Sequence, residues 1–213
     1  MAAQLELVQA APEFDTTPQR GDFDVIARMV DNGATVLDVG CGDGALITHL
    51  IRTCQARARG LERDKAKVRG CVVRGLSVVQ GDAETHLTDY PSASFKYVIF
   101  SHSFQKMTRP RDTLRHAGRV GEKVIVAIHN AAHWRNRARL ASKGRLLTKG
   151  QSWADGEIAR SCGVREFVEL ARDMRFSVDM AVPLSNDRPG APFAKTLWRA
   201  NMFAEEAVFL LTP

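Results

Sequence analysis

Residues 36–46 read Val36-Leu-Asp-Val-Gly-Cys-Gly-Asp-Gly-Ala-Leu46, an apolar run followed by closely spaced glycines and the start of a second apolar pattern. The apolar run predicts a buried β-strand, and glycines at alternate positions predict a tight turn into a helix. Such a turn lets the backbone approach a ligand closely, and the helix after it presents free N–H groups. We therefore expect a nucleotide-binding loop near the start of an α/β domain.

The acids around this loop bear on the kind of nucleotide. The spacing of Gly40, Gly42 and Ala45 also fits the dinucleotide fingerprint, in which a pyrophosphate rests on the helix N-terminus. Asp38 and Asp43 argue against it, because their carboxylates would repel a pyrophosphate in a partly desolvated site. S-adenosylmethionine (AdoMet) carries an ammonium and a sulfonium and no phosphate. The acids therefore favour AdoMet, or S-adenosylhomocysteine, and a dinucleotide is the alternative.

Two further acids follow the next strand-like segments. Glu62 comes after residues 58–61, where a βαβ unit places the acid that holds the ribose hydroxyls; a surface glutamate paired with a neighbouring cation is the alternative. Asp82 comes after residues 76–80 and is a candidate acceptor for the adenine amino group, or else a turn-forming aspartate. The predicted cofactor-binding residues are Asp38, Gly40, Cys41, Gly42, Asp43, Gly44, Glu62, Arg63, Asp82, Ala83 and Ser101.

Strand-like and helix-like segments alternate along the rest of the chain. Periodicity predicts helices over 23–30, 43–53, 109–120 and 164–174, a helix between Asp64 and Gly75 with Val68 and Val72 facing inward, and strands over 95–101, 124–128, 176–182 and 204–211. This alternation predicts a three-layer α/β fold with a mainly parallel sheet. Ligands of such folds bind at the C-terminal ends of the strands.

Composition and length favour one domain. The 213 residues are 45% hydrophobic and 25% charged, as in ordinary globular proteins. Residues 1–22 show no clear period and are expected to form a tail or flap, with one domain over 23–213. No apolar run approaches about 18 residues and no signal peptide is recognisable, so we expect a cytoplasmic protein without a membrane span. The four cysteines show neither C-x-x-C nor Cys/His spacing, so no metal site is predicted.

Several stretches, taken in order, resemble the MetW family, the methionine-biosynthesis branch of class I AdoMet-dependent methyltransferase-like proteins. They are residues 36–44, 71–82, 101–105 with 109–111, 130–135, 152–153 and 201–209. The resemblance implies a Rossmann-like class I methyltransferase fold with a mainly parallel, seven-stranded sheet and an antiparallel last strand. It also implies AdoMet held by Asp38, the loop glycines, Glu62 and Asp82. A role in methionine synthesis beside homoserine O-acyltransferase is implied as well, without a known methyl acceptor.

Three histidines follow the predicted fourth and fifth strands. A methyl acceptor that must lose a proton requires a base, and His102, His129 and His133 are the nearby groups that titrate near neutrality. Each is a candidate catalytic base, or else a packed or capping histidine. Residues 101–104 lack the Asn/Asp-Pro-Pro-aromatic sequence, which disfavours methylation of adenine or glutamine amino groups.

The net charge of +6 raises the question of a charged partner. Basic residues gather over 106–119 and 135–149, where a solvated helix face, a docking surface for an acidic protein and a nucleic-acid surface are the alternatives. Aromatic residues are scarce there apart from Trp134, so nucleic acid is the least favoured partner. If the family resemblance carries over, the basic stretch 135–145 beside Trp134 is expected to dock the acyltransferase. A small-molecule methyltransferase is the second function that stays open, and a nucleic-acid methyltransferase has the support of charge alone.

Overall fold

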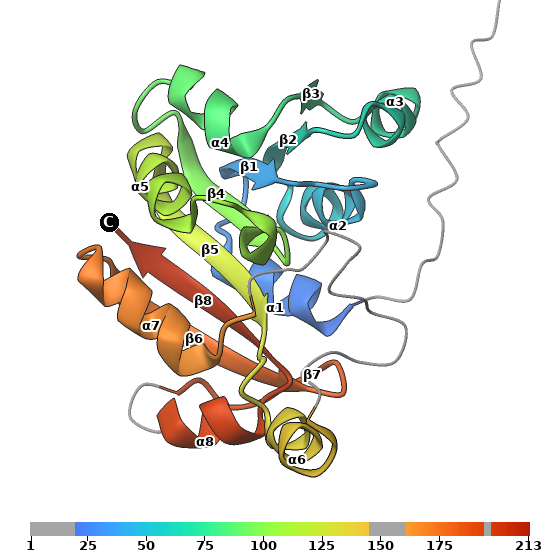
Figure 1. Ribbon diagram of the computed structural model, residues 1–213. Coiled ribbons are helices and arrows are strands. Elements are labelled where there is room, and N and C mark those ends of the chain that lie inside the picture. Colours follow the sequence, from blue (N-terminus) through green and yellow to red (C-terminus); the bar gives the residue numbers. More distant parts are fainter. Residues whose placement is uncertain (1–19, 145–160, 194–196) are drawn as a thin grey trace, which may run out of the picture.

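The structure, a computed structural model, describes residues 20–144, 161–193 and 197–213. Within these residues the strands form one eight-stranded sheet in the order β3-β2-β1-β4-β5-β8-β6-β7 (Figure 1). β1 to β5 pair in parallel, and β8 runs antiparallel between β5 and β6. The strands are β1 (Thr35–Val39), β2 (Arg57–Glu62), β3 (Val78–Gln80), β4 (Phe95–Ser101), β5 (Gly121–His129), β6 (Ser177–Ser185), β7 (Arg188–Pro189) and β8 (Glu206–Thr212).

Helices cover both faces of this sheet. The apolar sides of α1 and α2 pack on one face, and those of α4, α5 and α7 pack on the other (Figure 1). The helices are α1 (Gly21–Met29), α2 (Ala45–Cys54), α3 (Lys65–Val73), α4 (Ala83–His86), α5 (Pro110–Val120), α6 (Trp134–Lys143), α7 (Val164–Asp173) and α8 (Leu197–Phe203). The predicted three-layer α/β fold is confirmed, and the two-residue β7 extends the predicted seven-stranded sheet. Among the described residues, no helix combines the length and apolarity that crossing a bilayer requires.

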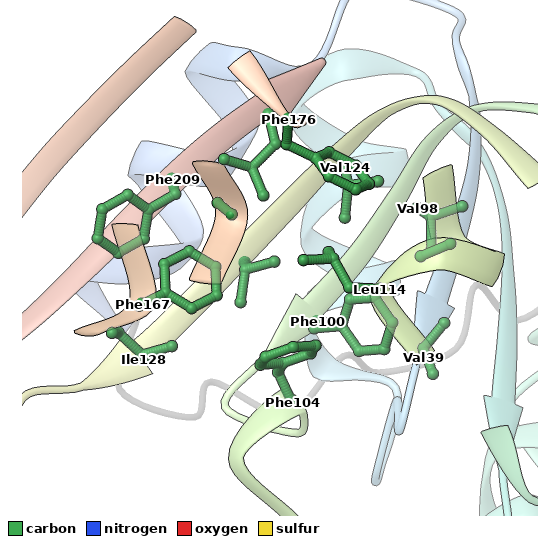
Figure 2. Packing of buried hydrophobic residues seen from close by; sticks show 14 of the residues in the cluster. Val39, Val98, Phe100, Phe104, Leu114, Val124, Ile128, Phe167, Phe176 and Phe209 are labelled. Atoms are coloured by element: carbon green, nitrogen blue, oxygen red, sulfur yellow. The ribbon is translucent and has the colours of Figure 1, made fainter. Parts of the chain in front are cut away.

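The larger core lies between the sheet and the α5/α7 layer. Side chains of β5 alternate between the faces, so that Val124, Val126 and Ile128 join this core while Ile125 and Ala127 pack on the opposite face. The aromatic rings of Phe104, Phe167 and Phe209 meet there, with ring centroids 5.7 Å apart for Phe104 and Phe167 and 4.7 Å apart for Phe167 and Phe209 (Figure 2). This packing holds β8 and the turn after β4 against α7.

The N-terminal boundary differs from the sequence-based expectation. α1 begins at Gly21, two residues before the predicted helix, and the Asp22 side chain is fully buried. Asp22 therefore belongs to the folded domain. Its burial depends on contacts with distant residues, which local periodicity does not report. The rest of the predicted tail, residues 1–19, lies outside the described residues.

Other differences concern helices at the periphery. Val72 is 55% exposed and α3 buries Cys71 instead, because α3 packs beside the glycine loop at the sheet edge and turns a single apolar residue inward. The connection expected between the last two strands contains β7 and α8. α8 buries Ala200 alone, so its apolar periodicity is weak. In the long segment between β5 and α7, residues 134–143 form α6, and residues 145–160 lie outside the described residues.

Phe167→Ala tests the importance of the aromatic core. Phe167 is 1% exposed, so its truncation is expected to lower the free energy of unfolding by about 3–5 kcal/mol through lost burial and a residual cavity. Phe203→Ala is the matched control, because this ring is 53% exposed and its loss should change stability by less than about 0.5 kcal/mol. Urea denaturation measures both. Equal losses of stability in the two variants would contradict this assignment of the core.

Candidate functional site

The loop between β1 and α2 has the conformation that its glycines allow. Gly40, Gly42 and Gly44 have φ angles of +75°, +60° and +77°, a region that other L-residues rarely adopt. A Cβ on Gly40 would lie 2.6 Å from Ser103 Cβ, and one on Gly44 would lie 2.5 Å from Leu76 Cδ1. A Cβ on Gly42 would meet no atom of the described residues within 4 Å. The loop is therefore packed beneath its first and third glycines and open at the second, where a ligand can approach.

Glu62, at the end of β2, supports this loop directly. Its Oε2 accepts a hydrogen bond from the Gly42 N–H at 2.9 Å, and its Oε1 accepts one from the Asp64 N–H at 2.9 Å. The residue is 9% exposed, and each carboxylate oxygen has a second lone pair. Glu62 therefore fixes the position of the loop in the protein itself. Its predicted bond to a ribose stays a prediction.

Asp38 is the most unusual group in the site. It is 1% exposed, and its Oδ1 has no hydrogen-bond partner among the described residues. Burial raises the pKa of Asp38 to about 7, with further contributions from the carboxylates of Glu62 and Asp43, while Arg20 partly opposes the shift. A buried carboxylate without a partner is costly, and a cation beside it would remove that cost. The ammonium or sulfonium of AdoMet fits this site, and a pyrophosphate does not.

The remaining predicted cofactor residues lie at the same edge of the sheet and have several structural roles. Asp43 is exposed and accepts a hydrogen bond at 3.1 Å from the N–H of Ala45, the first residue of α2. Asp82 caps α4 by accepting from the Glu84 N–H at 2.8 Å. Cys41 is buried, and burial is the main cause that raises the pKa of its thiol. Arg63 is exposed. Ala83 is buried as the first residue of α4, and Ser101 is partly buried at the end of β4.

The three candidate histidines do not form one group. His102 follows β4 and His129 ends β5, and their rings stack with centroids 4.0 Å apart and planes 19° apart. His133 is buried separately, where its Nδ1 accepts from the Arg135 N–H at 3.3 Å and caps α6. Burial lowers the pKa of His133. The structure therefore brings His102 and His129 together and gives His133 a capping role.

Asp22 contacts His102 and was not among the residues predicted from the sequence. Arg20 donates two hydrogen bonds to the Asp22 carboxylate, from Nε to Oδ1 at 3.0 Å and from Nη2 to Oδ2 at 2.8 Å. The Ser101 hydroxyl donates a third hydrogen bond to Asp22 Oδ2 at 3.1 Å. The same Oδ2 lies 3.2 Å from His102 Nε2. Burial raises the pKa of Asp22, but the interactions with His102 and Arg20 outweigh that effect and hold the pKa below its usual value.

Glu206, at the start of β8, was also missed. Its Oε1 lies 3.0 Å from His129 Nδ1, and its Oε2 lies 3.5 Å from His102 Nε2. Burial raises the pKa of Glu206, and the two histidines outweigh that effect and lower it. The available sequence signal was an acid directly before the apolar run 207–211, but its partners lie in distant strands.

Residues of the family-like stretches fix the end of β5. Gln105 pairs with the His129 backbone twice: its Oε1 accepts from the N–H at 2.9 Å and its Nε2 donates to the carbonyl at 3.0 Å. Asn130 is 3% exposed and donates from Nδ2 to the carbonyl oxygens of Asn201 at 3.0 Å and Ala204 at 2.7 Å. These two amides tie β5 to the turn after β4 and to α8.

Two solved structures are similar in fold. A SAM-dependent methyltransferase of Thermotoga maritima, described as a possible histamine N-methyltransferase, superposes with a TM-score of 0.64 at 17% identity, over 90% of this chain and 87% of that chain. The [4+2]-cyclase SpnF superposes with a TM-score of 0.63 at 20% identity, over 89% and 79% of the two chains. Identities this low establish the fold alone.

Sequence comparison gives a more specific result. The bifunctional methionine biosynthesis protein MetXA/MetW of Rhodopirellula baltica is 26% identical over an alignment of 132 residues that covers 58% of this chain and 21% of that protein. This chain thus spans about a fifth of the length of that curated relative. The model of the family described as methionine biosynthesis protein MetW matches residues 20–211, nearly the whole described chain. The chain therefore belongs to the MetW family and is a methionine biosynthesis protein with a methyltransferase fold.

Proposed function

We propose that this protein binds AdoMet or S-adenosylhomocysteine and acts in methionine synthesis together with a homoserine O-acyltransferase. The observation that carries the cofactor assignment is the buried Asp38 carboxylate, whose Oδ1 has no partner among the described residues and lies beside a glycine loop open at Gly42. A cationic nucleoside supplies the missing charge, and the helix after the loop completes the site. Asp38 would face the cationic part of AdoMet, Glu62 the ribose and Asp82 the adenine.

The chemistry that AdoMet supplies when bound is a methyl group activated by the sulfonium. The residues of this chain would bind and orient the nucleoside. The left-handed glycines let the backbone approach it, and Glu62 holds Gly42 in place through its backbone N–H. These contacts suit a protein that uses AdoMet as a methyl donor and equally one that senses it as a ligand.

The proposed association with the acyltransferase rests on the family and on an exposed surface. The related Rhodopirellula baltica protein is named MetXA/MetW, so the two functions are combined in one chain there. In this protein α6 buries none of its side chains, Trp134 is 46% exposed, and the Arg135 guanidinium lies 5.7 Å from the Trp134 ring centre. On α8, Trp198 and Phe203 are 66% and 53% exposed. Exposed aromatics beside arginine are typical of interface hot spots.

A small-molecule methyltransferase is the second candidate function. The stacked pair His102 and His129 favours it, because the two rings lie at the ends of β4, which adjoins β1, and of β5, which adjoins β4, and could accept a proton from a methyl acceptor. Turnover of radiolabelled AdoMet in an unbiased acceptor screen separates this function from the first one.

Asp38→Asn tests the cofactor site. The variant keeps the shape of the side chain but removes its charge, so affinity for AdoMet should fall about 10- to 100-fold, as expected for loss of a hydrogen bond to a charged group. The free energy of unfolding of the ligand-free variant should stay equal or rise, because a repelling buried charge is gone. Titration calorimetry and urea denaturation measure the two effects. Asp112→Asn on α5 is the control, and wild-type affinity in Asp38→Asn, or tighter binding of NAD, would remove AdoMet from this site.

The raised pKa of Asp38 predicts a pH dependence. Because the folded-state pKa of about 7 exceeds the ordinary value of 3.8, folding takes up a proton between these values. The contribution of this group to stability is therefore present at low pH and is lost as pH rises through about 7. Affinity for the cationic AdoMet should rise over the same interval, because the ionised carboxylate binds the cation better. Calorimetric titrations over a pH series should show this rise in the wild type and a flatter profile in Asp38→Asn; equal profiles would contradict the assignment.

Trp134→Ala tests the docking surface. If Trp134 is an interface anchor, its truncation should weaken the complex with the homoserine O-acyltransferase of the same organism about 30-fold or more. Arg139→Glu should weaken it too, by reversing a charge on the same helix, whereas Arg135 already pairs with Glu205 at 2.9 Å and is less suitable. Surface plasmon resonance gives both affinities, and AdoMet binding should be unchanged.

Val73→Ala is the matched control for this experiment. Val73 is 81% exposed and belongs to α3, which packs at the opposite end of the sheet from α6. The Val73→Ala substitution should leave the affinity for the acyltransferase unchanged. Failure of the unaltered protein to bind the acyltransferase, together with methyl transfer to a small acceptor, would support the second candidate function instead.

A further inference from the structure

His102, His129 and Glu206 form a compact cluster at the ends of three neighbouring strands. β5 and β8 pair so that His129 stands directly opposite Glu206, and the His102 N–H donates to the Ala127 carbonyl of β5 at 3.1 Å. One nitrogen of each ring and one carboxylate oxygen all lie within 4.8 Å of one another. The three residues are far apart in sequence, and the order β4-β5-β8 brings them together at one edge of the sheet (Figure 1).

The surroundings of His102 are unusual for a packing histidine. Both of its ring nitrogens are buried: Nε2 lies 3.2 Å from Asp22 Oδ2 and 3.5 Å from Glu206 Oε2, whereas Nδ1 has no hydrogen-bond partner within the described part of the chain. Its φ angle is +56°, an uncommon conformation for a residue other than glycine. A buried nitrogen without a partner and a left-handed backbone both cost free energy, and such costs are concentrated at functional sites.

The two carboxylates beside His102 differ in their partners. Arg20 pairs with Asp22 at 2.8 Å, so Asp22 has an arginine as its counter-ion. The ion partners of Glu206 in the described structure are the rings of His102 and His129, and no lysine or arginine of the described residues pairs with it. A metal ion held by the two rings would place a cation beside the Glu206 carboxylate.

We propose that His102, His129 and Glu206 bind one divalent transition-metal ion, of which Zn²⁺ is the best match. Two imidazole nitrogens and one carboxylate oxygen are a donor set that Zn²⁺ takes in open sites, with a fourth position left for water or a substrate atom. Bond lengths of about 2.0–2.2 Å require the donor atoms to move closer together than in the empty cluster. His129 is the residue that turns, because its side chain is 64% exposed whereas that of His102 is 11% exposed.

The proposed metal site lies near the proposed AdoMet site, where it could activate a methyl acceptor. Asp22 contacts His102, and the charge of the same Asp22 also acts on Asp38, so the cluster and the proposed AdoMet site lie within electrostatic reach. A substrate thiol or hydroxyl in the open position would lose its proton more easily and lie on the nucleoside side of the sheet. Metal binding itself rests on the cluster alone and does not require that AdoMet bind.

Metal titration of protein without a polyhistidine tag tests the proposal. After dialysis against a chelator, the wild type should bind one Zn²⁺ per chain by calorimetry, and Co²⁺ should give the visible absorption bands of a four-coordinate site. His129→Ala and Glu206→Gln should both lose this binding and these bands. Both side chains are partly exposed, so the variants are expected to fold, and circular dichroism checks that they do.

His116→Ala is the matched control, because His116 lies on α5 outside the cluster and should leave one Zn²⁺ bound. Zn²⁺ should also raise the Tm of the wild type and of His116→Ala, but not that of the two cluster variants, since a ligand of the native state stabilises it. Absence of Zn²⁺ and Co²⁺ binding in the wild type would overturn the proposal. Undiminished binding in both His129→Ala and Glu206→Gln would overturn it as well, because the metal would then lie elsewhere.

Discussion

The burial of the Asp38 carboxylate is the constraint on which the site depends. Asp38 lies on β1 in the middle of the parallel sheet, where its register pairs it with Gly60 of β2 and Ile99 of β4. Neither of these two residues carries a charge, and burial, together with the nearby carboxylates, raises the pKa of Asp38. The apolar cores on both faces of the sheet stabilise the fold strongly enough to hold this unfavourable group in place. The fold thus maintains a position that a cation completes.

Many polar side chains near the C-terminal ends of the strands form hydrogen bonds with backbone groups of the protein itself. Glu62 holds Gly42 and Asp64, the Ser103 hydroxyl donates to the Val39 carbonyl, and Gln105 pairs with the backbone of His129. Such bonds fix where the strands end and how the loops leave them. Their replacement would therefore displace the loops first and the ligand contacts as a consequence.

The fold and the family membership give different kinds of information about the function of this protein. Its structural relatives include a SAM-dependent methyltransferase and a cyclase, so the fold alone does not define a reaction. The family adds methionine biosynthesis. Asn130 connects the two regions that carry the proposals, because it follows the His129 end of β5 and bonds to the backbone of α8. The Asn130 amide, which is buried, thus links the strand ends that carry the proposed sites to the exposed aromatic surface of α6 and α8.

The sequence by itself determined the features that short windows encode. Apolar patterns predicted β1 to β6, β8 and most of the described helices, and the spacing of Gly40, Gly42 and Gly44 predicted the loop. The placement of Glu62 at the end of β2 also followed from local order along the chain. The helix between Asp64 and Gly75 was predicted and is α3, but its inward residue was assigned wrongly, and α8 was not predicted, because a single inward side chain leaves no repeating signal.

Only the tertiary structure decided which polar groups meet. Asp22 lies before the first predicted helix, and Glu206 lies in the last strand, yet both contact His102. Their proximity depends on α1 packing across the sheet and on β8 inserting antiparallel beside β5. Such pairings are set by the free energy of burying whole apolar faces together, summed over residues far apart in the chain. No local pattern carries that information, so the acids around the two histidines became visible only in the folded molecule.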